Sequence, residues 1–218
     1  MKNLILPIFL FLITAFFSCS EKQETKVETE NIVELPTEIP IENYHYNPST
    51  TEVKWTAFKQ SKKVPVNGKF DSLMVSGFTP SNKLSESITG VSIELFTSST
   101  NTNDKARDLK IINSFFGVLL NSVSIKANII SANGDDSGDG ILLIDMNGVK
   151  KEQPFTWSVD AYDELFMKTT INVLDWGGEK ALSALNKVCE AKHTGPDDTE
   201  SKLWPDVEII VLSKLDKE

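Results

Sequence analysis

His193 follows Cys189 by four residues, a spacing that places both side chains on one face of a helix. A thiolate and an imidazole are common zinc ligands, so this pair has the chemistry of half a metal site. The other histidine, His45, lies at the far end of the chain, and two ligands do not make a site. Cys189 also shares an apolar stripe with Leu182 and Leu185, where a thiol packs as a small hydrophobic side chain. We therefore predict a core cysteine and no metal site.

Asp135, Asp136 and Asp139 form a second group with ligand chemistry, because clustered carboxylates can bind calcium. Their spacing does not fit the EF-hand loop, and its bidentate glutamate is missing at the required distance. We interpret 133–140 as a tight or mobile, solvated connection between strands. The sequence has no nucleophile elbow, no phosphate-binding glycine loop and no His-Glu-x-x-His pattern. We predict no catalytic residue and no cofactor, since a hydrolase that used carboxylates has no motif here to support it.

The N-terminus has the features of a secretory signal, with Lys2 before an apolar run over 4–17. The run is shorter than the roughly 20 residues that a membrane span needs. Phe16-Phe17-Ser18-Cys19 is similar to a bacterial lipoprotein box, in which the cysteine becomes the lipid-bearing N-terminus. We predict a signal peptide over 1–18, lipidation of Cys19 and attachment to the bacterial cell envelope, at the periplasmic or surface face of the outer membrane. An uncleaved anchor or a plain secretory signal is the alternative.

Without its signal the chain has 200 residues (218 minus 18) and a formal charge of −10 (21 basic minus 31 acidic residues). An acidic chain is repelled by nucleic acid and by anionic headgroups, so we expect no nucleic-acid partner. Membrane contact is expected through the lipid anchor alone. With Cys19 lipidated, Cys189 has no disulfide partner, and the core must hold the fold. The sequence does not indicate an oligomeric state.

Residues 19–43 contain seven glutamates and no aromatic residue, which predicts a disordered acidic tether. From Tyr44 onward, apolar and polar residues alternate with the period of half-buried strands. The regular segments are 53–57, 91–95, 123–129, 155–159, 165–173 and 207–211, and 64–75 and 141–146 are less regular. One helical pattern begins at Asn103 or Asp104 and has Leu109, Ile112 and Phe116 on one face. A second helical pattern runs from about Glu179 to Ala191.

About eight strands with one or two short helices predict an all-β fold, a closed antiparallel barrel over residues 44–218. Closure removes the exposed edges that long apolar strands would otherwise present. A barrel of about eight strands has room inside for side chains and one small ligand.

The order of several segments resembles the YceI-like family over residues 44–215. Two departures are Phe58-Lys59, where that family commonly has a histidine, and Gly117, where a proline often follows its paired aromatic residues. The segments that carry the resemblance are Tyr46–Phe58 (opening strand), Val64–Phe70 (second strand), Thr102–Leu109 with its Arg-Asp pair before a short helix, Phe115-Phe116, and Leu142–Val149 with its Asn-Gly-Val ending.

The resemblance implies a lipocalin-like β-barrel that holds a long isoprenoid or similar apolar lipid. We therefore hypothesise a tethered, non-catalytic envelope lipoprotein that binds such a lipid. The alternative is a structural or interaction module whose barrel is filled by its own side chains, with 193–204 as its partner surface. The predicted ligand-binding residues, each on the apolar face of its strand, are Trp55, Val91, Ile93, Leu95, Ile125, Ile129, Phe155, Trp157, Met167 and Ile171.

Overall fold

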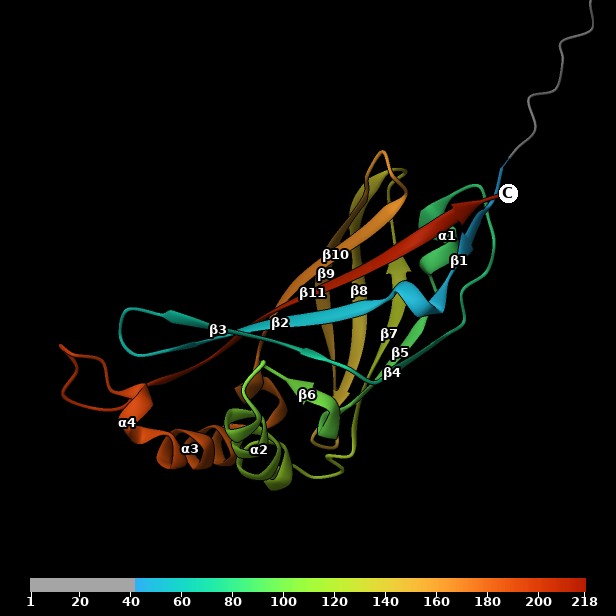
Figure 1. Cartoon of the computed structure of the whole chain (residues 1–218). Helices are drawn as coiled ribbons and strands as arrows, with labels where there is room; N and C mark the ends of the chain where they lie inside the picture. The colour runs from blue at the N-terminus through green and yellow to red at the C-terminus, as the bar shows by residue number, and fades with distance from the viewer. Residues whose placement is uncertain (1–41) are drawn as a thin grey trace, which may run out of the picture. The chain divides into compact units, whose positions relative to one another are not determined.

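Antiparallel strands dominate residues 42–218, the part of the chain that this computed structural model describes (Figure 1). The predicted signal peptide and most of the predicted tether lie outside these residues. The strands are β1 (Tyr44–Tyr46), β2 (Glu52–Lys59), β3 (Val64–Phe70), β4 (Leu73–Ser76), β5 (Ser92–Phe96), β6 (Thr100–Asn101), β7 (Ser124–Ala132), β8 (Ser137–Met146), β9 (Val149–Val159), β10 (Glu164–Asn172) and β11 (Leu203–Lys217). The α-helices are α1 (Leu84–Ile88), α2 (Lys105–Ser114), α3 (Glu179–Val188) and α4 (Glu190–His193). Within residues 42–218, the helices are all too short or too polar to cross a membrane.

The strands follow the order β4-β5-β7-β8-β9-β10-β11-β2-β3-β6. β3 runs directly into β4, and β5 leads through a short 3₁₀ turn into β6. At the bend, the Asp71 amide donates to the Ser99 carbonyl (3.0 Å) and the Phe96 amide to the Ser72 carbonyl (3.2 Å). Eight antiparallel stretches therefore surround one interior, which confirms the predicted lipocalin-like barrel.

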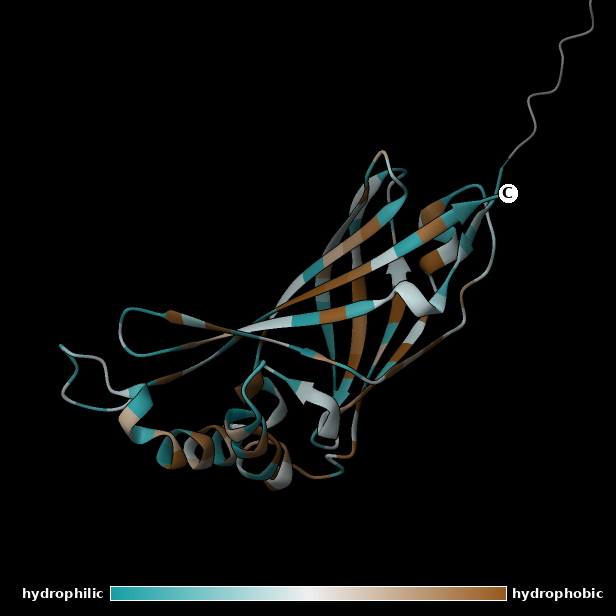
Figure 2. Ribbon diagram, viewed as in Figure 1, coloured by the Kyte–Doolittle hydropathy of each residue, from teal (hydrophilic) through white to brown (hydrophobic). Residues whose placement is uncertain are grey.

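Alternation of residue type explains why these strands close around a core (Figure 2). In β10, Leu165, Met167, Thr169 and Ile171 are buried, and the residues between them are exposed. The same period of two recurs in β5 and β8. Each strand thus turns one apolar face inward, as the sequence pattern predicted.

One segment interpreted as a loop is partly strand. Ser137–Gly140 begins β8 and pairs with Ser158–Phe155 of β9, which leaves only 133–136 as the turn. A Cβ atom on Gly140 would lie 2.3 Å from the Ser131 carbonyl oxygen and 2.5 Å from the Phe155 ring. The glycine is therefore required by close packing within the barrel wall, and not by a flexible connection.

The helical predictions were correct in position and wrong in detail. Asp104 caps α2, as expected, but Leu109 is 59% exposed and Ile111, at 8%, is the buried residue. The second helix divides at Cys189 into α3 and α4. α2 and α3 lie together at one end of the barrel, whereas α1 and β1 lie at the other (Figure 1).

Candidate functional site

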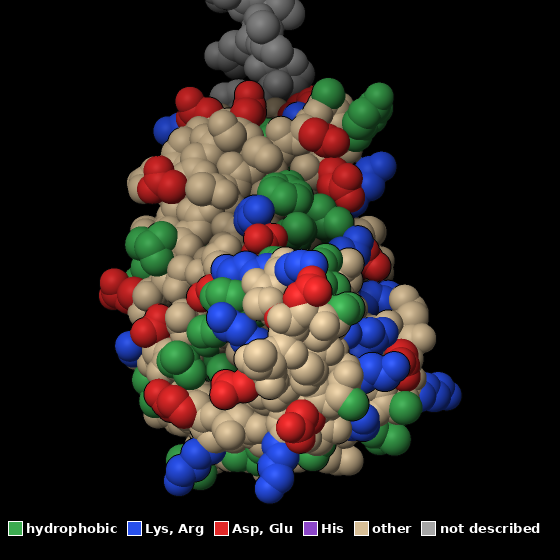
Figure 3. Space-filling view, turned by 90° about the vertical axis from the view of Figure 1, so that its left-hand side faces the viewer, with side chains coloured by type: hydrophobic (Ala, Val, Ile, Leu, Met, Phe, Trp, Pro, Cys, Tyr) green, Lys and Arg blue, Asp and Glu red, His purple; other side chains and the backbone are tan. Residues whose placement is uncertain are grey.

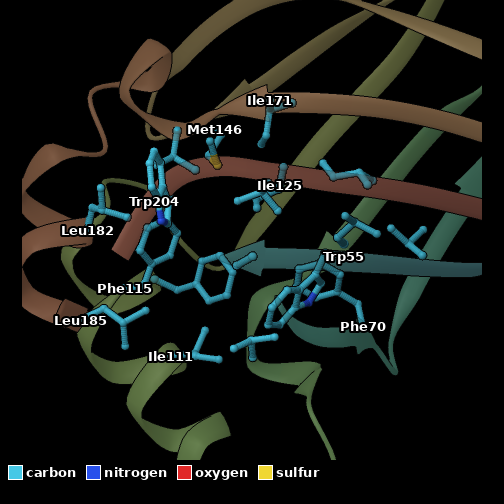
Figure 4. Close-up of a pocket in the computed structure, with 18 of the residues that line it drawn as sticks. Trp55, Phe70, Ile111, Phe115, Ile125, Met146, Ile171, Leu182, Leu185 and Trp204 are labelled. Atoms are coloured by element: carbon cyan, nitrogen blue, oxygen red, sulfur yellow. The ribbon is translucent and has the colours of Figure 1, made fainter. Parts of the chain in front are cut away.

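A cavity of about 530 Å³ occupies the barrel interior beneath α2 and α3. Side chains from β2, β3, β5, β7, β8, β9, β10 and β11, that is from all eight stretches of the barrel, contribute to its wall. Its volume lies within the roughly 300–1,000 Å³ that is usual for small-molecule sites. Figure 4 shows Trp55, Phe70, Ile125 and Ile171 directed toward this space from different strands.

Trp55 forms part of the cavity wall because its neighbour across the β2–β3 ladder is a glycine. A Cβ atom on Gly68 would lie 2.3 Å from the Trp55 ring, so the indole lies flat across β3. Within residues 42–218, the buried indole nitrogen of Trp55 has no hydrogen-bond partner. The large ring of Trp55 therefore forms a broad part of the cavity wall.

The two helices supply the rest of the apolar wall. Ile111 and Phe115 come from α2 and the residue that follows it, and Leu182 and Leu185 come from α3 (Figure 4). The rings of Phe115 and Phe116 meet edge to face, with centroids 5.2 Å apart. The helices thus cover the end of the barrel with apolar side chains and close much of the cavity from water.

A hydrogen-bonded network fixes the start of α2. The Asp104 carboxylate accepts the backbone N–H groups of Ala106 and Arg107, each at 3.1 Å. The Thr102 hydroxyl donates to Asp108 (2.5 Å) and accepts from the Arg107 side chain (2.8 Å). Arg107 and Asp108, the Arg-Asp pair of segment 102–109, therefore fix the orientation of the helix, and Arg107 lies at the cavity edge.

Seven of the ten predicted residues line this cavity, and their contact with a ligand stays a prediction. Val91 and Ile129 instead border a space of about 30 Å³ toward α1, and Trp157 is 2% exposed and donates from its indole to the Asn133 carbonyl (3.1 Å). The period of two indicates which side chains point inward, but not how far along the barrel they lie. The seven are Trp55, Ile93, Leu95, Ile125, Phe155, Met167 and Ile171.

Sequence reasoning missed the contribution of the helices and of Trp204. The stripe of Leu182, Leu185 and Cys189 was interpreted as core, and it does face the interior, but it borders the cavity. Cys189 is a half-buried free thiol there. Within residues 42–218, no group of three or more His, Cys, Asp or Glu side chains is close enough to hold a metal ion.

His193 is buried beside the same cavity, and its Nδ1 donates to the Asn186 side-chain oxygen at 2.8 Å. Burial, and then the charges of Lys59 and Lys110, lower the pKa of His193 from 6.5 to about 4. The imidazole is therefore neutral at pH 7. Lys59, Lys110 and His193 come from β2, α2 and α4, so the cavity edge joins three elements that are far apart in sequence.

Comparison with known proteins gave matches to solved structures. The chain matches a polyisoprenoid binding domain from Saccharophagus degradans implicated in plant cell wall breakdown (TM-score 0.56, 12% identity, 80% of this chain and 98% of that one). BcnA of Burkholderia cenocepacia also matches (0.54, 10%, 78% and 98%), as does a Campylobacter jejuni YCEI protein (0.50, 15%, 70% and 85%). The chain has the YceI-like fold. No protein-family model matches the sequence, and no curated protein does.

The YceI-like assignment made from the order of segments is therefore supported by three-dimensional structure. The Saccharophagus and Burkholderia matches cover 98% of those chains, so nearly the whole of each has a counterpart here. At 10–16% identity the likeness concerns the fold, and the chemistry of the cavity must be derived from this chain's own residues.

Proposed function

We propose that the barrel binds a long apolar lipid of prenyl type in the 530 Å³ cavity and does not transform it. The observation that carries the proposal is this cavity, lined by apolar side chains from every stretch of the barrel. The description of the Saccharophagus domain as polyisoprenoid-binding supports a prenyl-type ligand. The alternative, a barrel filled by its own side chains, fits the end beneath α1 but does not fit the end beneath α2 and α3.

Energy considerations favour a long chain over a small apolar molecule. Burial of one CH₂ group contributes about 0.8 kcal/mol, so ten carbons contribute roughly 8 kcal/mol. Association costs an estimated 4–15 kcal/mol in lost freedom. Firm retention therefore requires a tail longer than about ten carbons.

A binding role is also supported by the state of the groups that could act in catalysis. Asn186, Cys189 and His193 are the residue types of a cysteine-hydrolase triad, and the latter two line the cavity. The His193–Asn186 hydrogen bond is formed. Within residues 42–218, however, no hydrogen bond joins the Cys189 thiol to His193, whereas an activated nucleophile ordinarily lies within hydrogen-bond reach of its base.

Solvent extraction of the purified protein followed by mass spectrometry tests the proposal. We expect a prenyl-type lipid at close to one per chain from the wild type. Ala127→Phe, which places a ring inside the cavity, is expected to carry little lipid, whereas Ile130→Phe, on the exposed face of the same strand, should carry the wild-type amount. Repeated recovery of no lipid, or equal recovery from both variants, would contradict the proposal.

We further propose that lipid on Cys19 tethers the protein in the bacterial cell envelope. The support is the predicted signal peptide over 1–18, with its basic start and apolar run, and the box that ends at Cys19. Growth with radiolabelled palmitate should label the wild-type chain and leave Cys19→Ala unlabelled. Equal label in Cys19→Ala would rule out this attachment, and Cys189→Ala is the matched control that should keep its label.

A further inference from the structure

The segment that joins α2 to β7, residues 117–123, exposes three large apolar side chains. Val118 is 42% exposed, Leu120 68% and Val123 77%. Val123 is in phase with Ile125 and Ala127, which line the cavity, yet it precedes the strand and lies at the surface. Figure 2 shows the apolar character of this segment at the lower edge of the molecule, beside α2. We call residues 117–123 the apolar segment.

Hydrogen bonds and buried neighbours fix the backbone of the apolar segment, so its exposed side chains stay outside the core. The Leu120 amide donates to the side-chain oxygen of Asn147 (2.7 Å), whose amide nitrogen donates to the Trp176 carbonyl (2.7 Å). Phe116 and Leu119 are buried on either side of Val118. Grouped apolar side chains that a fixed backbone holds at the surface indicate an interaction site.

The apolar segment lies within an uncharged stretch of sequence. No charged residue occurs from 111 to 125, although 24% of the chain is charged. Lys110 and Lys126 bound the stretch, and Lys126 is paired with Glu94 (3.4 Å). Lysine stems can lie along an apolar surface while their ammonium groups stay at a polar boundary. By contrast, the face that carries α4 and the β2–β3 turn has charged side chains of both signs across it (Figure 3).

The composition of the apolar segment fits a lipid surface better than a protein partner. Its residues are Gly, Val, Leu, Asn and Ser. Trp, Tyr and Arg dominate protein–protein binding energy, whereas Leu and Val are under-represented there. A stable protein interface also uses about 20–30 residues on each side. A bilayer requires no complementary partner surface, because binding follows from the apolar area that enters it.

The predicted tether is long enough for this end of the barrel to reach the membrane that holds the anchor. The tether joins the barrel at β1, which pairs with Leu215–Lys217 at the end of β11. The apolar segment lies at the other end, beside α2 (Figure 1). β11 has 15 residues and spans roughly 50 Å at about 3.3 Å per residue. The 25 residues of 19–43 (43 minus 18) extend to at most roughly 80–90 Å.

We propose that the apolar segment inserts into the surface of a lipid bilayer and docks the open end of the barrel on the membrane. Docking adds a second membrane contact to the predicted lipid anchor. The cavity lies beneath the same end, so a docked barrel exchanges an apolar ligand with the bilayer and not with water. This consequence, unlike the docking itself, rests on the proposed function.

Flotation with phosphatidylcholine vesicles tests the docking. The mature chain from Ser20 is used, because it keeps the whole barrel and lacks the predicted signal and anchor, which would bind vesicles themselves. We expect it to float with the vesicles, and equally well at high salt because the contact is apolar. Leu120→Ser combined with Val123→Ser should weaken binding about tenfold, since two inserted apolar side chains are lost.

Tyr162→Ser combined with Ile130→Ser is the matched control. It also removes two exposed large apolar side chains, one from the β9–β10 turn and one from the outer face of β7. This variant should bind vesicles as the unsubstituted chain does. All four substituted side chains are exposed, so both double variants should keep the urea midpoint of the unsubstituted chain.

A fluorophore placed in the apolar segment gives a second, position-specific measurement. With Cys189→Ala as background, the polarity-sensitive dye NBD is attached through Leu120→Cys or, as control, through Tyr162→Cys. Vesicles should shift the emission of the dye at position 120 to shorter wavelengths, and spin-labelled lipid should quench it. The dye at position 162 should show neither effect.

Several results would overturn the docking. They are no binding to vesicles, binding that Leu120→Ser with Val123→Ser leaves unchanged, and binding that high salt abolishes. A dimer that the same double substitution converts to monomers would assign the apolar segment to a second copy of the chain, and would also overturn it. Lipid recovered by solvent extraction from a chain that does not bind vesicles would overturn the docking and leave the proposed function intact. Vesicle binding by a chain that yields no lipid would support the docking and contradict the proposed function.

Discussion

The two ends of the barrel are built from the same strands, yet one is packed and the other holds open space. Toward α1, Leu84, Ile88 and Leu215 are almost completely buried, and only about 30 Å³ is vacant. Toward α2 and α3, about 530 Å³ is vacant. Ile93 and Met167 border both spaces and form the layer between them. One half of the interior therefore stabilises the fold and leaves the other half free to bind.

The difference arises from how each end is covered. At the α1 end the cover brings bulky side chains into the barrel, as in the stacked rings of Tyr46 and Phe78, whose centroids are 5.5 Å apart. The Tyr46 hydroxyl and Ser213 both hydrogen-bond to Thr51, so the polar groups there are paired internally. At the other end the two helices lie across the opening, and their apolar side chains line the space without filling it.

The largest expected effect is a difference in stability loss between alanine substitutions of two isoleucines in β7. Ile129 is 2% exposed in the packed half, so Ile129→Ala should lower the free energy of unfolding by about 2–5 kcal/mol. Ile125 is half-buried beside the cavity, and Ile125→Ala should cost only about 1 kcal/mol because less surface is lost. Urea denaturation measures both. Equal losses would contradict the division of the interior into two halves.

Gly68→Ala is expected to displace the Trp55 ring and so change the shape of the cavity. The added Cβ overlaps the Trp55 ring, so the indole must move, at a cost of about 1–3 kcal/mol in stability. Lipid affinity should fall with it, and the fluorescence maximum of the protein should shift. Adding Trp55→Ala to Gly68→Ala should recover stability relative to Gly68→Ala alone. Unchanged stability and an unchanged fluorescence spectrum in Gly68→Ala would show that Trp55 does not pack against Gly68.

The cover of the open end depends on the cap of α2. Asp104→Ala removes the acceptor of two backbone N–H groups and should cost about 0.5–2 kcal/mol. Asp104→Asn retains a capping oxygen and should cost much less. Hydrogen exchange should quicken in α2 of Asp104→Ala and remain unchanged in α1. Faster exchange at both ends would mean that the two covers are not independent.

The smallest effect is a pH dependence at the open end. The unfolded chain protonates His193 from about pH 6.5 downward, whereas the folded chain does so only near pH 4. This contribution to stability is therefore complete above pH 6.5 and is lost as the pH falls toward 4. Denaturation at pH 7 and pH 5 should show the loss in the wild type, and His193→Gln should show less of it. An identical change in the two proteins would exclude His193 as the cause.

The sequence allowed the barrel to be predicted because alternation over segments such as 165–173 has one structural solution, a wall with an apolar inner face. It did not predict which inner residues border space. Val91 and Ile129 follow the same pattern as Ile93 and Ile125, and only the three-dimensional position relative to α1 or α2 distinguishes them.

The position of several lysines at the edge of the cavity could not be predicted from the sequence either. Lys59, Lys110 and Lys192 lie on three elements, and no local pattern relates them before the chain folds. Likewise Gly138 and Gly140 indicate a turn by residue type, whereas pairing with Trp157 and Phe155 of β9 places them in a strand. In each case the deciding contact is long-range.

Photo-crosslinking tests most directly whether lipid binds in the open half of the barrel and not in the packed half. A prenyl alcohol with a diazirine near the end of its tail would be bound to the full chain, irradiated, and the labelled peptides mapped by mass spectrometry. Labels should fall on cavity residues beneath α2 and α3, such as Ile125, Met146 and Phe115. Labels concentrated around Phe78 and Ile129, or on the outer faces of the strands, would contradict a lipid site in the open half of the barrel.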